Sequence, residues 1–386
     1  MTYLIAIDWL ALHCHYEPPR PDPSPKNFAD GSDDVQVWEP DESAGGDVFG
    51  TYPWRYKLAD YGTRQFARLY RVAMPNAEGG WDDFAEVQAS PHSGILYKNS
   101  VIVRFVNRTL YLPDFWELAT RFLSDNNFAF KGISRIDICA DFNQFKTIAP
   151  RTLIEDFAAK KLRHVGRGVG ALYFNHGKMR DENAIDVIEY SVKYTGLSFG
   201  THASDARAYL YDKSFELMTQ GDKPWIRDTW TAAGLDVRHV WRLEISLKSK
   251  GCKFKDKISG NKIIIDNTRV KDRDELTKIY HTFEKKLFAF VKNRKGITNI
   301  TREPRLELFT LAPVYSRGVI RNLSAGNRFD RMFIKALYQM GDLYRGAANI
   351  DTADLAQSFA VNIAESTDQV EWMSQKVREW ERPTHK

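Results

Sequence analysis

The chain has 386 residues, of which 43% are hydrophobic and 13% aromatic, and its formal net charge is +5. This length allows two ordinary domains or one large domain with additions. No apolar run approaches the ~20 residues that cross a bilayer, which argues against a membrane protein. The cysteines Cys14, Cys139 and Cys252 are far apart and form no CxxC pair. Their spacing argues against a disulfide framework or zinc ribbon and predicts a reducing, cytoplasmic location.

The charges are unevenly distributed along the chain. Residues 242–305 contain 18 Lys or Arg and 8 Asp or Glu, whereas residues 27–50 contain seven acids and no Lys or Arg. Because Lys and Arg displace condensed counterions from phosphates, the basic stretch favours a polyanionic partner such as DNA. A solvated helix face is the alternative interpretation of the same composition.

The predicted elements begin with an apolar strand rather than a signal peptide, since Asp8 interrupts the run and no basic region precedes it. Further strands are expected from runs rich in aromatic and branched residues; the predicted strands are 2–14, 64–73, 100–106, 133–141, 187–194, 206–212 and 240–248. Helical spacing of apolar residues predicts the helices: 113–126, 151–161, 272–293, 328–346 and 351–381.

This order of elements predicts an α+β fold with a mainly antiparallel central sheet and flanking helices. We expect a catalytic domain over residues 1–250, interrupted by an acidic, Pro-rich insertion at about 17–50. A basic, mainly helical region over 251–386 would then serve DNA binding or oligomerisation.

Strand alternation gathers chemically active side chains on three strand faces. It groups Arg135, Asp137, Cys139 and Asp141; Arg207, Tyr209, Tyr211 and Lys213; and Arg242, Glu244, Ser246 and Lys248. Each set alone is typical of ion pairs on a solvated face. Brought together, such faces could bind a hard metal ion through carboxylates and hold a phosphodiester beside a tyrosine nucleophile.

Four segments in order resemble a known family. They are AIDWLAL around Asp8, RIDICADF at 135–142, YTGLSFGTHASDARAYLYDK at 194–213 and WRLEISLK at 241–248. Together they resemble the replication initiators of rolling-circle plasmids and the related nicking relaxases of integrative conjugative elements. The resemblance covers about residues 2–250, and each motif alone is weakly specific.

The resemblance implies a Rep-nuclease-like fold and a metal-dependent nicking-closing endonuclease that starts rolling-circle replication or conjugative transfer. Tyr211 falls on the nucleophile, which would leave a 5′-phosphotyrosine intermediate, and Lys213 and Arg242 would face the phosphate. A subset of Asp8, Asp137, Asp141 and Glu244 would hold Mg²⁺ or Mn²⁺. Gly200 and Ser204 would shape the turn before the nucleophile, whereas His202 and Ser214 depart from the family's pattern.

The expected partners are duplex and single-stranded DNA at an origin, a host helicase and a second copy of the chain. The residues expected to contact DNA are Arg207, Lys248, Lys250, Lys253, Lys255, Lys285 and Lys286. The neighbouring aromatics are assigned to the core by their helical spacing; they are Phe254, Tyr280, Phe283, Phe288 and Phe290.

Several alternatives stay open. Tyr209 shares a strand face with Tyr211, so only the resemblance separates the two as nucleophile. His13 and His15 could bind metal together, but alternation from Asp8 places them on the opposite face unless a bulge intervenes. A non-catalytic origin-binding protein is the main rival function. A tyrosine recombinase is a weaker alternative, since the sequence has no set of Arg and His residues around a C-terminal tyrosine. The sequence also has no Walker motif, which argues against an ATP-driven helicase.

Overall fold

The computed structural model describes residues 2–17, 38–40, 53–92, 96–166, 170–175, 193–201, 203–256, 258–294, 299–310, 312–315 and 317–318. All of them lie in one compact unit, Met1–Gly318. The boundary expected near residue 250 falls inside this unit, because the helix Arg273–Leu287 packs on the large sheet and the strand Phe290–Lys292 pairs with Leu162–His164. The helices predicted at 328–346 and 351–381 and most of the insertion at 17–50 lie outside the described residues.

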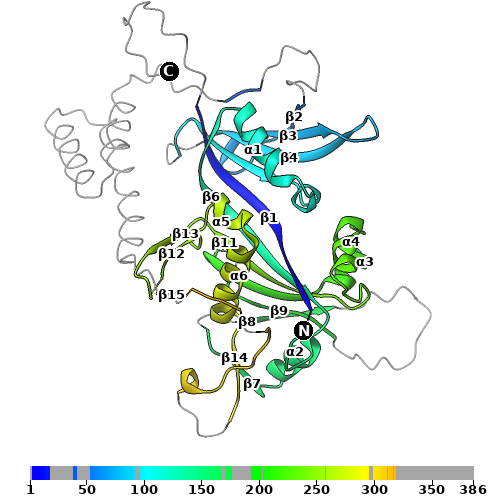
Figure 1. The fold of residues 1–386 in the computed structure, drawn as a ribbon, viewed down its shortest axis with the longest axis vertical. Helices are drawn as coiled ribbons and strands as arrows, with labels where there is room; N and C mark the ends of the chain where they lie inside the picture. The colour runs from blue at the N-terminus through cyan, green and yellow to red at the C-terminus, as the bar shows by residue number, and fades with distance from the viewer. Residues whose placement is uncertain are drawn as a thin grey trace, which may run out of the picture. The chain divides into compact units, whose positions relative to one another are not determined.

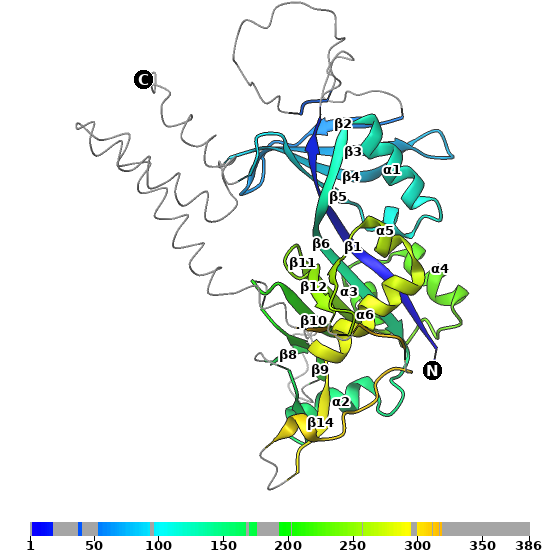
Figure 2. The ribbon, with the colours of Figure 1, turned by 60° about the vertical axis from the view of Figure 1, so that its left-hand side comes forward.

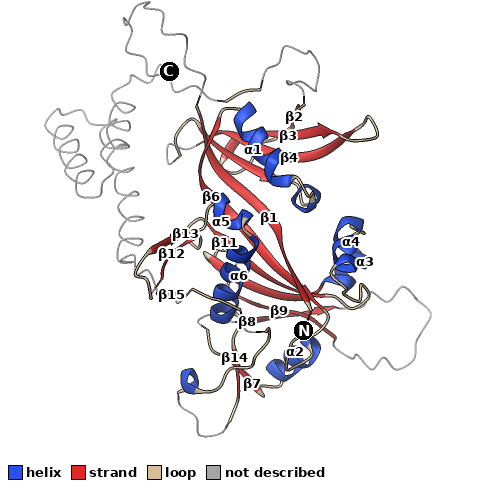
Figure 3. Ribbon diagram, viewed as in Figure 1, coloured by secondary structure: helices blue, strands red, loops and turns tan. Residues whose placement is uncertain are grey.

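The fold is α+β and is built on one large antiparallel sheet (Figure 1). In spatial order its ten strands are β2 (Arg55–Leu58), β3 (Phe66–Pro75), β4 (Trp81–Pro91), β5 (Ser100–Phe105), β1 (Tyr3–Tyr16), β6 (Phe128–Phe142), β11 (Trp241–Lys248), β10 (Ala206–Asp212), β9 (Lys193–Phe199) and β8 (Gly170–Asn175). The long strands β1 and β6 pair along most of their length and run through the middle of the sheet (Figure 3).

The remaining elements are short. Two small sheets contain β13 (Lys262–Ile264), β12 (Lys253–Asp256) and β15 (Arg317–Gly318), and β14 (Phe290–Lys292) and β7 (Leu162–His164). The α-helices are α1 (Phe115–Asp125), α2 (Pro150–Ala158), α3 (Lys213–Gln220), α4 (Pro224–Ala232), α5 (Asn267–Lys271) and α6 (Arg273–Leu287), and two 3₁₀ turns span Arg108–Tyr111 and Ile300–Arg302.

Helix α6 corrects one prediction. It begins at the N-cap Asp272, whose side chain accepts hydrogen bonds from the backbone N–H groups of Asp274 and Glu275. It ends at Leu287, because Phe288 leaves the helical conformation (φ −134°) and the chain turns into β14. The helix predicted over 272–293 is therefore too long by its last six residues.

Helices α1 and α6 cover the same face of the sheet (Figure 2). Phe122 of α1 packs against Phe84, and Tyr280 of α6 is fully buried and donates a hydrogen bond to the carbonyl of Leu243. The aromatics assigned to the core from the sequence are buried here. Alternation turns Arg242 and Tyr211 to the opposite face, where α3 and α4 cover one end. Among the described ranges, no helix is long and apolar enough to span a bilayer.

Candidate functional site

The register of β6, β11 and β10 joins the three predicted strand faces into one surface. Arg242 on β11 pairs with Asp141 on one side and with Tyr211 on the other. Two residues further along β11, Glu244 pairs with Cys139 on β6 and with Tyr209 on β10. The alternation predicted from the sequence is therefore confirmed for these strands, and the predicted nucleophile and acids lie on one face.

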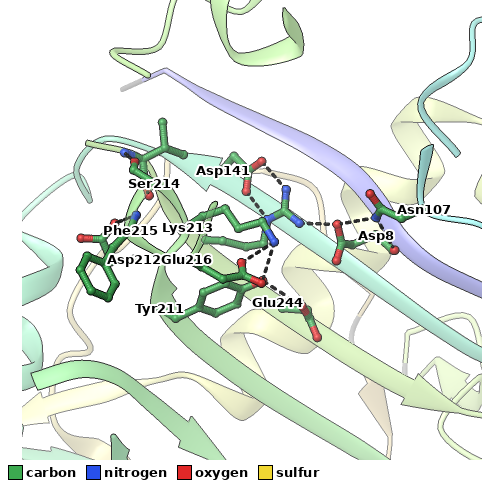
Figure 4. Close-up of polar contacts among 12 residues, drawn as sticks. Asp8, Asn107, Asp141, Tyr211, Asp212, Lys213, Ser214, Phe215, Glu216 and Glu244 are labelled. Carbon is green, nitrogen blue, oxygen red and sulfur yellow. Dashed lines mark hydrogen bonds and ion pairs between the residues drawn. The ribbon is translucent and has the colours of Figure 1, made fainter. Parts of the chain in front are cut away.

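Arg242 is the centre of a buried ion cluster (Figure 4). Its Nε and Nη2 donate to the two carboxylate oxygens of Asp141 at 2.6 and 2.7 Å, and its Nη1 binds Asp8. Arg242 and Asp141 are 0% and 1% exposed, and the indole Nε1 of Trp230 donates to the same Asp141 at 2.6 Å. The two carboxylates thus compensate a guanidinium that has no access to solvent.

Asp8 reaches this cluster because β1 contains a β-bulge. Ile7 pairs with Ile138 and Trp9 with Asp137, so Asp8 is an extra residue between them. The amide of Asn107 donates to the Asp8 carbonyl at 2.9 Å and to its carboxylate at 3.0 Å. The bulge turns a carboxylate toward Arg242 without taking a position in the ladder.

Tyr211 lies beside this cluster, with its hydroxyl between a carboxylate and an ammonium group. The hydroxyl is 3.4 Å from Glu244 Oε2 and 3.5 Å from Lys213 Nζ. The Tyr211 side chain is buried, and Lys213 is itself 2% exposed and forms an ion pair with Glu216 at 2.5 Å. Asp212, between them, caps α3 by accepting from the backbone N–H of Phe215, which fixes the direction of both neighbours.

The pKa shifts of Tyr211 and Glu244 suit a proton donor and a proton acceptor, respectively. Burial, and then the charge of Glu244, raise the pKa of Tyr211 well above its ordinary value. Burial, followed by the charges of Asp137 and Asp8, raises the pKa of Glu244 to about 8. A buried phenol does not ionise by itself near neutral pH, so its attack requires an adjacent base. Glu244 is placed for that role and has a pKa near working pH.

The pKa of Asp8 is shifted in the opposite direction to that of Glu244, whereas the pKa of Asp137 is shifted in the same direction. Burial opposes the charge of Asp8, but Arg242 and Lys213 outweigh it and lower the pKa of Asp8 to about 2. Asp137 forms an ion pair with Arg135 at 2.5 Å, yet its burial raises its pKa. Asp8 is therefore a fixed negative charge, whereas Asp137 and Glu244 repel each other.

The predicted metal ligands fit a divalent ion only in part. Asp8 and Asp141 are bound to Arg242, and within the described ranges no group of three His, Cys, Asp or Glu side chains is placed to hold an ion. Glu244 and Asp137 are the predicted ligands whose pKa is raised, first by burial and then by neighbouring acids, a repulsion that a cation relieves. They fit an ion completed by water and substrate phosphate, as Mg²⁺ is often bound.

Tyr209 stacks on Tyr211, with ring centroids 4.7 Å apart and planes 27° apart. Its ring also lies over Gly196, where an added Cβ would be 3.0 Å from Tyr209 Cε2 and 2.9 Å from the carbonyl oxygen of Leu210. The hydroxyl of Tyr211, with both a carboxylate and an ammonium nearby, has the surroundings of a nucleophile. Tyr209 has a packing position that orients its neighbour.

The turn before β10 has the form expected from the sequence. Gly200 has φ +93°, which favours glycine, and the Ser204 hydroxyl accepts from the backbone N–H of Thr201 at 3.0 Å. Ser214 ties the start of α3 to the chain before β11, since its hydroxyl accepts from the Val240 N–H at 2.5 Å. His202 lies outside the described residues.

The residues expected to contact DNA are not all on the face of Tyr211. Arg207 and Lys248 lie on that face, on β10 and β11. Lys250 follows β11 in a turn, and Lys253 and Lys255 are exposed on β12. Lys285 and Lys286 end α6, which covers the opposite face. The structure therefore brings only Arg207 and Lys248 into the surface that contains the site.

His13 and His15 lie on the face of the site, contrary to simple alternation from Asp8, because the bulge shifts the phase of β1. Their rings contact edge to face at 5.2 Å. Burial lowers the pKa of both, that of His15 to about 4, so both are neutral near pH 7. They are several residues from Asp8 along β1 and outside the Arg242 cluster.

Sequence reasoning missed the residues that complete the cluster. Tyr111 receives a hydrogen bond from Arg242 Nη2 at 3.2 Å, and Trp225 donates to the Asn107 side chain at 3.1 Å. Lys223, whose pKa is lowered by burial and then by the charge of Lys213, adds a cation facing the site. These residues come from a 3₁₀ turn and from α4, and no periodicity in the sequence links them to β10 or β11.

Comparison with known proteins gives a partial likeness to solved structures. No family model matches the sequence, and no curated protein matches it. Among solved structures, a rolling circle replication initiator protein from Geobacillus stearothermophilus is 13% identical, with 79% of this chain and 92% of that chain covered and a TM-score of 0.39. A similarity of this degree does not assign the chain to a family.

Proposed function

We propose that this protein is a tyrosine-dependent DNA strand transferase that nicks one strand at a replication or transfer origin. The observation that carries the proposal is the Tyr211 hydroxyl, buried between Glu244 and Lys213 beside the Arg242 cluster. The order of motifs in the sequence supports the same assignment.

In the proposed step, the Tyr211 oxygen attacks a phosphodiester phosphorus while its proton passes to Glu244 Oε2. The bond from phosphorus to the 3′-oxygen breaks, and that oxygen takes a proton from solvent to become a free 3′-hydroxyl. The 5′-phosphate stays on Tyr211 as a phosphotyrosine. Attack by a 3′-hydroxyl on this linkage reverses the step and rejoins the strand.

The cations around Tyr211 offset the charge that develops on the phosphate. Lys213 is nearest the phenol oxygen, and Lys223 faces the same site. A Mg²⁺ or Mn²⁺ ion held by Glu244 and Asp137 would polarise the phosphate when bound. Arg242 is fully buried between Asp8 and Asp141, so we assign it to positioning these strands rather than to phosphate contact.

Formation of a protein–DNA adduct that survives SDS tests the proposal. Purified full-length protein, single-stranded oligonucleotides that tile the candidate origin, and Mg²⁺ or Mn²⁺ should give the adduct. Tyr211→Phe should abolish it, whereas the stacked neighbour variant Tyr209→Phe should retain it at a lower rate. An adduct that persists in Tyr211→Phe would contradict the assigned nucleophile. No adduct across the tiled origin would favour a non-catalytic origin-binding protein.

A second copy of the chain and a host helicase remain predicted partners.

A further inference from the structure

The register of the large sheet aligns a row of seven residues across seven of its strands, and six of these residues are charged. Directly paired positions run from β2 to β11 without interruption. We call these residues the cross-sheet row: Lys57, Arg71, Glu86, Arg104, Ala11, Arg135 and Lys248. Since strands lie about 4.8 Å apart, the row is roughly 29 Å wide. It contains five cations and one acid, all on the face of Tyr211.

Two positions in the row place one cation directly opposite another. Lys57 is directly opposite Arg71, and Arg135 is directly opposite Lys248. Like charges directly opposite one another destabilise a sheet. Lys57 and Arg71 are exposed, and the Arg135 side chain is 40% exposed, so an external anion can reach them. Phosphates bound along the row would offset the repulsion between the facing cations, and this would favour binding of a polyanion.

Trp9 holds the middle of the row in place. The guanidinium carbons of Arg104 and Arg135, from the strands on either side of β1, lie 4.7 and 4.6 Å from its ring centroid. Arg104 also forms an ion pair with Glu86. The two arginines are therefore ordered before any ligand binds, which lowers the entropic cost of binding.

The row connects to the nucleophile through β10. Arg207 pairs with Ser246, two residues before Lys248, and its guanidinium lies 5.3 Å from the ring centroid of Tyr209. Tyr209 in turn stacks on Tyr211. A polyanion that follows the row is thus led along Arg207 and Tyr209 to the Tyr211 hydroxyl. Tyr211 is only 9% exposed, and a flexible single strand can approach a buried hydroxyl more readily than a stiff duplex can.

We infer that the cross-sheet row binds the backbone of single-stranded DNA and leads it to Tyr211. This inference rests on the proposed function, because it identifies the track by which the substrate of that site arrives. It assigns a DNA contact to Lys57 and Arg71, which lie on strands far from the motifs around Tyr211.

A salt titration with a matched control tests the inference. The test variant combines Lys57→Gln, Arg71→Gln and Lys248→Gln, and the control combines Arg121→Gln, Lys161→Gln and Arg238→Gln. The control side chains are 57%, 71% and 78% exposed and lie outside the row. Both sets are made in full-length Tyr211→Phe protein, so cleavage cannot interfere, and binding of a fluorescein-labelled 30-mer of thymidylate is followed by anisotropy.

Single-strand binding loses about 0.7 in log–log salt slope for each phosphate contact removed. The test variant should therefore reduce the slope by about 2 and weaken binding at least about tenfold at 0.1 M salt, whereas the control should match Tyr211→Phe. The thermal midpoint of the test variant should not fall, because both like-charge pairs are removed. Equal slopes for the two variants would overturn the inference, as would tighter binding of a duplex of the same length.

The result is separable from the fate of the proposed function. If wild-type protein forms no adduct but the test variant loses single-strand affinity, the row stands and the nicking proposal fails. If wild-type protein forms the adduct while the test variant binds like the control, nicking stands and the row fails.

Discussion

Arg242 holds Asp141 by two parallel hydrogen bonds, from Nε and Nη2 to the two carboxylate oxygens, at a depth that solvent does not reach. This bidentate pair joins β11 to β6 and, through Asp8, to β1. It gives three strands of the site a common fixed point, from which the positions of Tyr211 and Glu244 follow.

Removing that fixed point should destabilise the fold. Arg242→Gln would leave Asp141 and Asp8 as uncompensated negative charges, one of them fully buried. Loss of one partner of a buried ion pair costs roughly 3–5 kcal/mol. Urea denaturation followed by tryptophan fluorescence measures it. Arg238→Gln, which breaks an exposed pair with Asp236, should leave the midpoint nearly unchanged, and an equal effect of both variants would contradict the role of Arg242.

Adduct formation should depend on pH through Glu244. Because the pKa of Glu244 is about 8, the fraction of Glu244 that is deprotonated and able to accept the Tyr211 proton rises with pH up to about that value. An ion held by Glu244 would lower this pKa, so the midpoint measured with Mg²⁺ should lie below 8. The single-turnover rate should rise by up to about tenfold per pH unit below that midpoint and level off above it. Glu244→Gln should slow the rate by roughly 100-fold and remove this dependence, and a wild-type pH profile equal to that of Glu244→Gln would exclude Glu244 as the base.

Stability should change with pH in the opposite direction. The pKa of Glu244 is above its ordinary value of 4.5 in the folded state, so the folded protein binds this proton more tightly than the unfolded chain. Its contribution to the free energy of unfolding is therefore present below pH 4.5 and is lost as pH rises through about 8. Comparing thermal midpoints at pH 6 and 9 should show a smaller decrease in Glu244→Gln than in wild type.

Binding of a divalent ion should release a proton. The pKa of Glu244 is about 8, so an ion held by Glu244 and Asp137 displaces the proton that Glu244 binds near neutral pH. Calorimetric titration of the DNA-free protein with Mn²⁺ should show tighter binding at pH 8.5 than at pH 6.5. Glu244→Gln should weaken binding by at least about tenfold, whereas Glu39→Gln, an exposed carboxylate near Arg68, should not. Equal Mn²⁺ affinity in both variants would remove Glu244 from the ion site.

The tyrosine stack should depend on Gly196. An added Cβ there meets Tyr209 and the backbone of Leu210 at 3.0 and 2.9 Å, so Gly196→Ala must displace the ring that packs on Tyr211. We expect a lower thermal midpoint and an adduct rate reduced more than tenfold. Gly132→Ala, on β6 of the same sheet, is the control, because a Cβ there meets no atom within 4 Å. An unchanged rate in Gly196→Ala would show that the stack does not orient Tyr211.

The sequence predicted the composition of the site better than its connections. Alternation correctly placed Arg242 and Glu244 on one face of β11, because side chains of a strand repeat every two residues. It could not predict that Arg242 pairs with Asp141, since pairing depends on the register between strands about a hundred residues apart. The contribution of Asn107 was equally hidden, because it comes from a loop whose position depends on tertiary packing.

The bulge at Asp8 makes this carboxylate an addition to β1 rather than a member of its ladder. Ile7 and Trp9 are paired on either side of it with Ile138 and Asp137. A chain lacking Asp8 altogether could therefore keep the pairing partners of its neighbours, and the sheet would close without a gap. The carboxylate of Asp8 is thus modular. Insertion of one residue adds it to β1 and deletion of that residue removes it, while the pairing of the neighbouring residues stays the same.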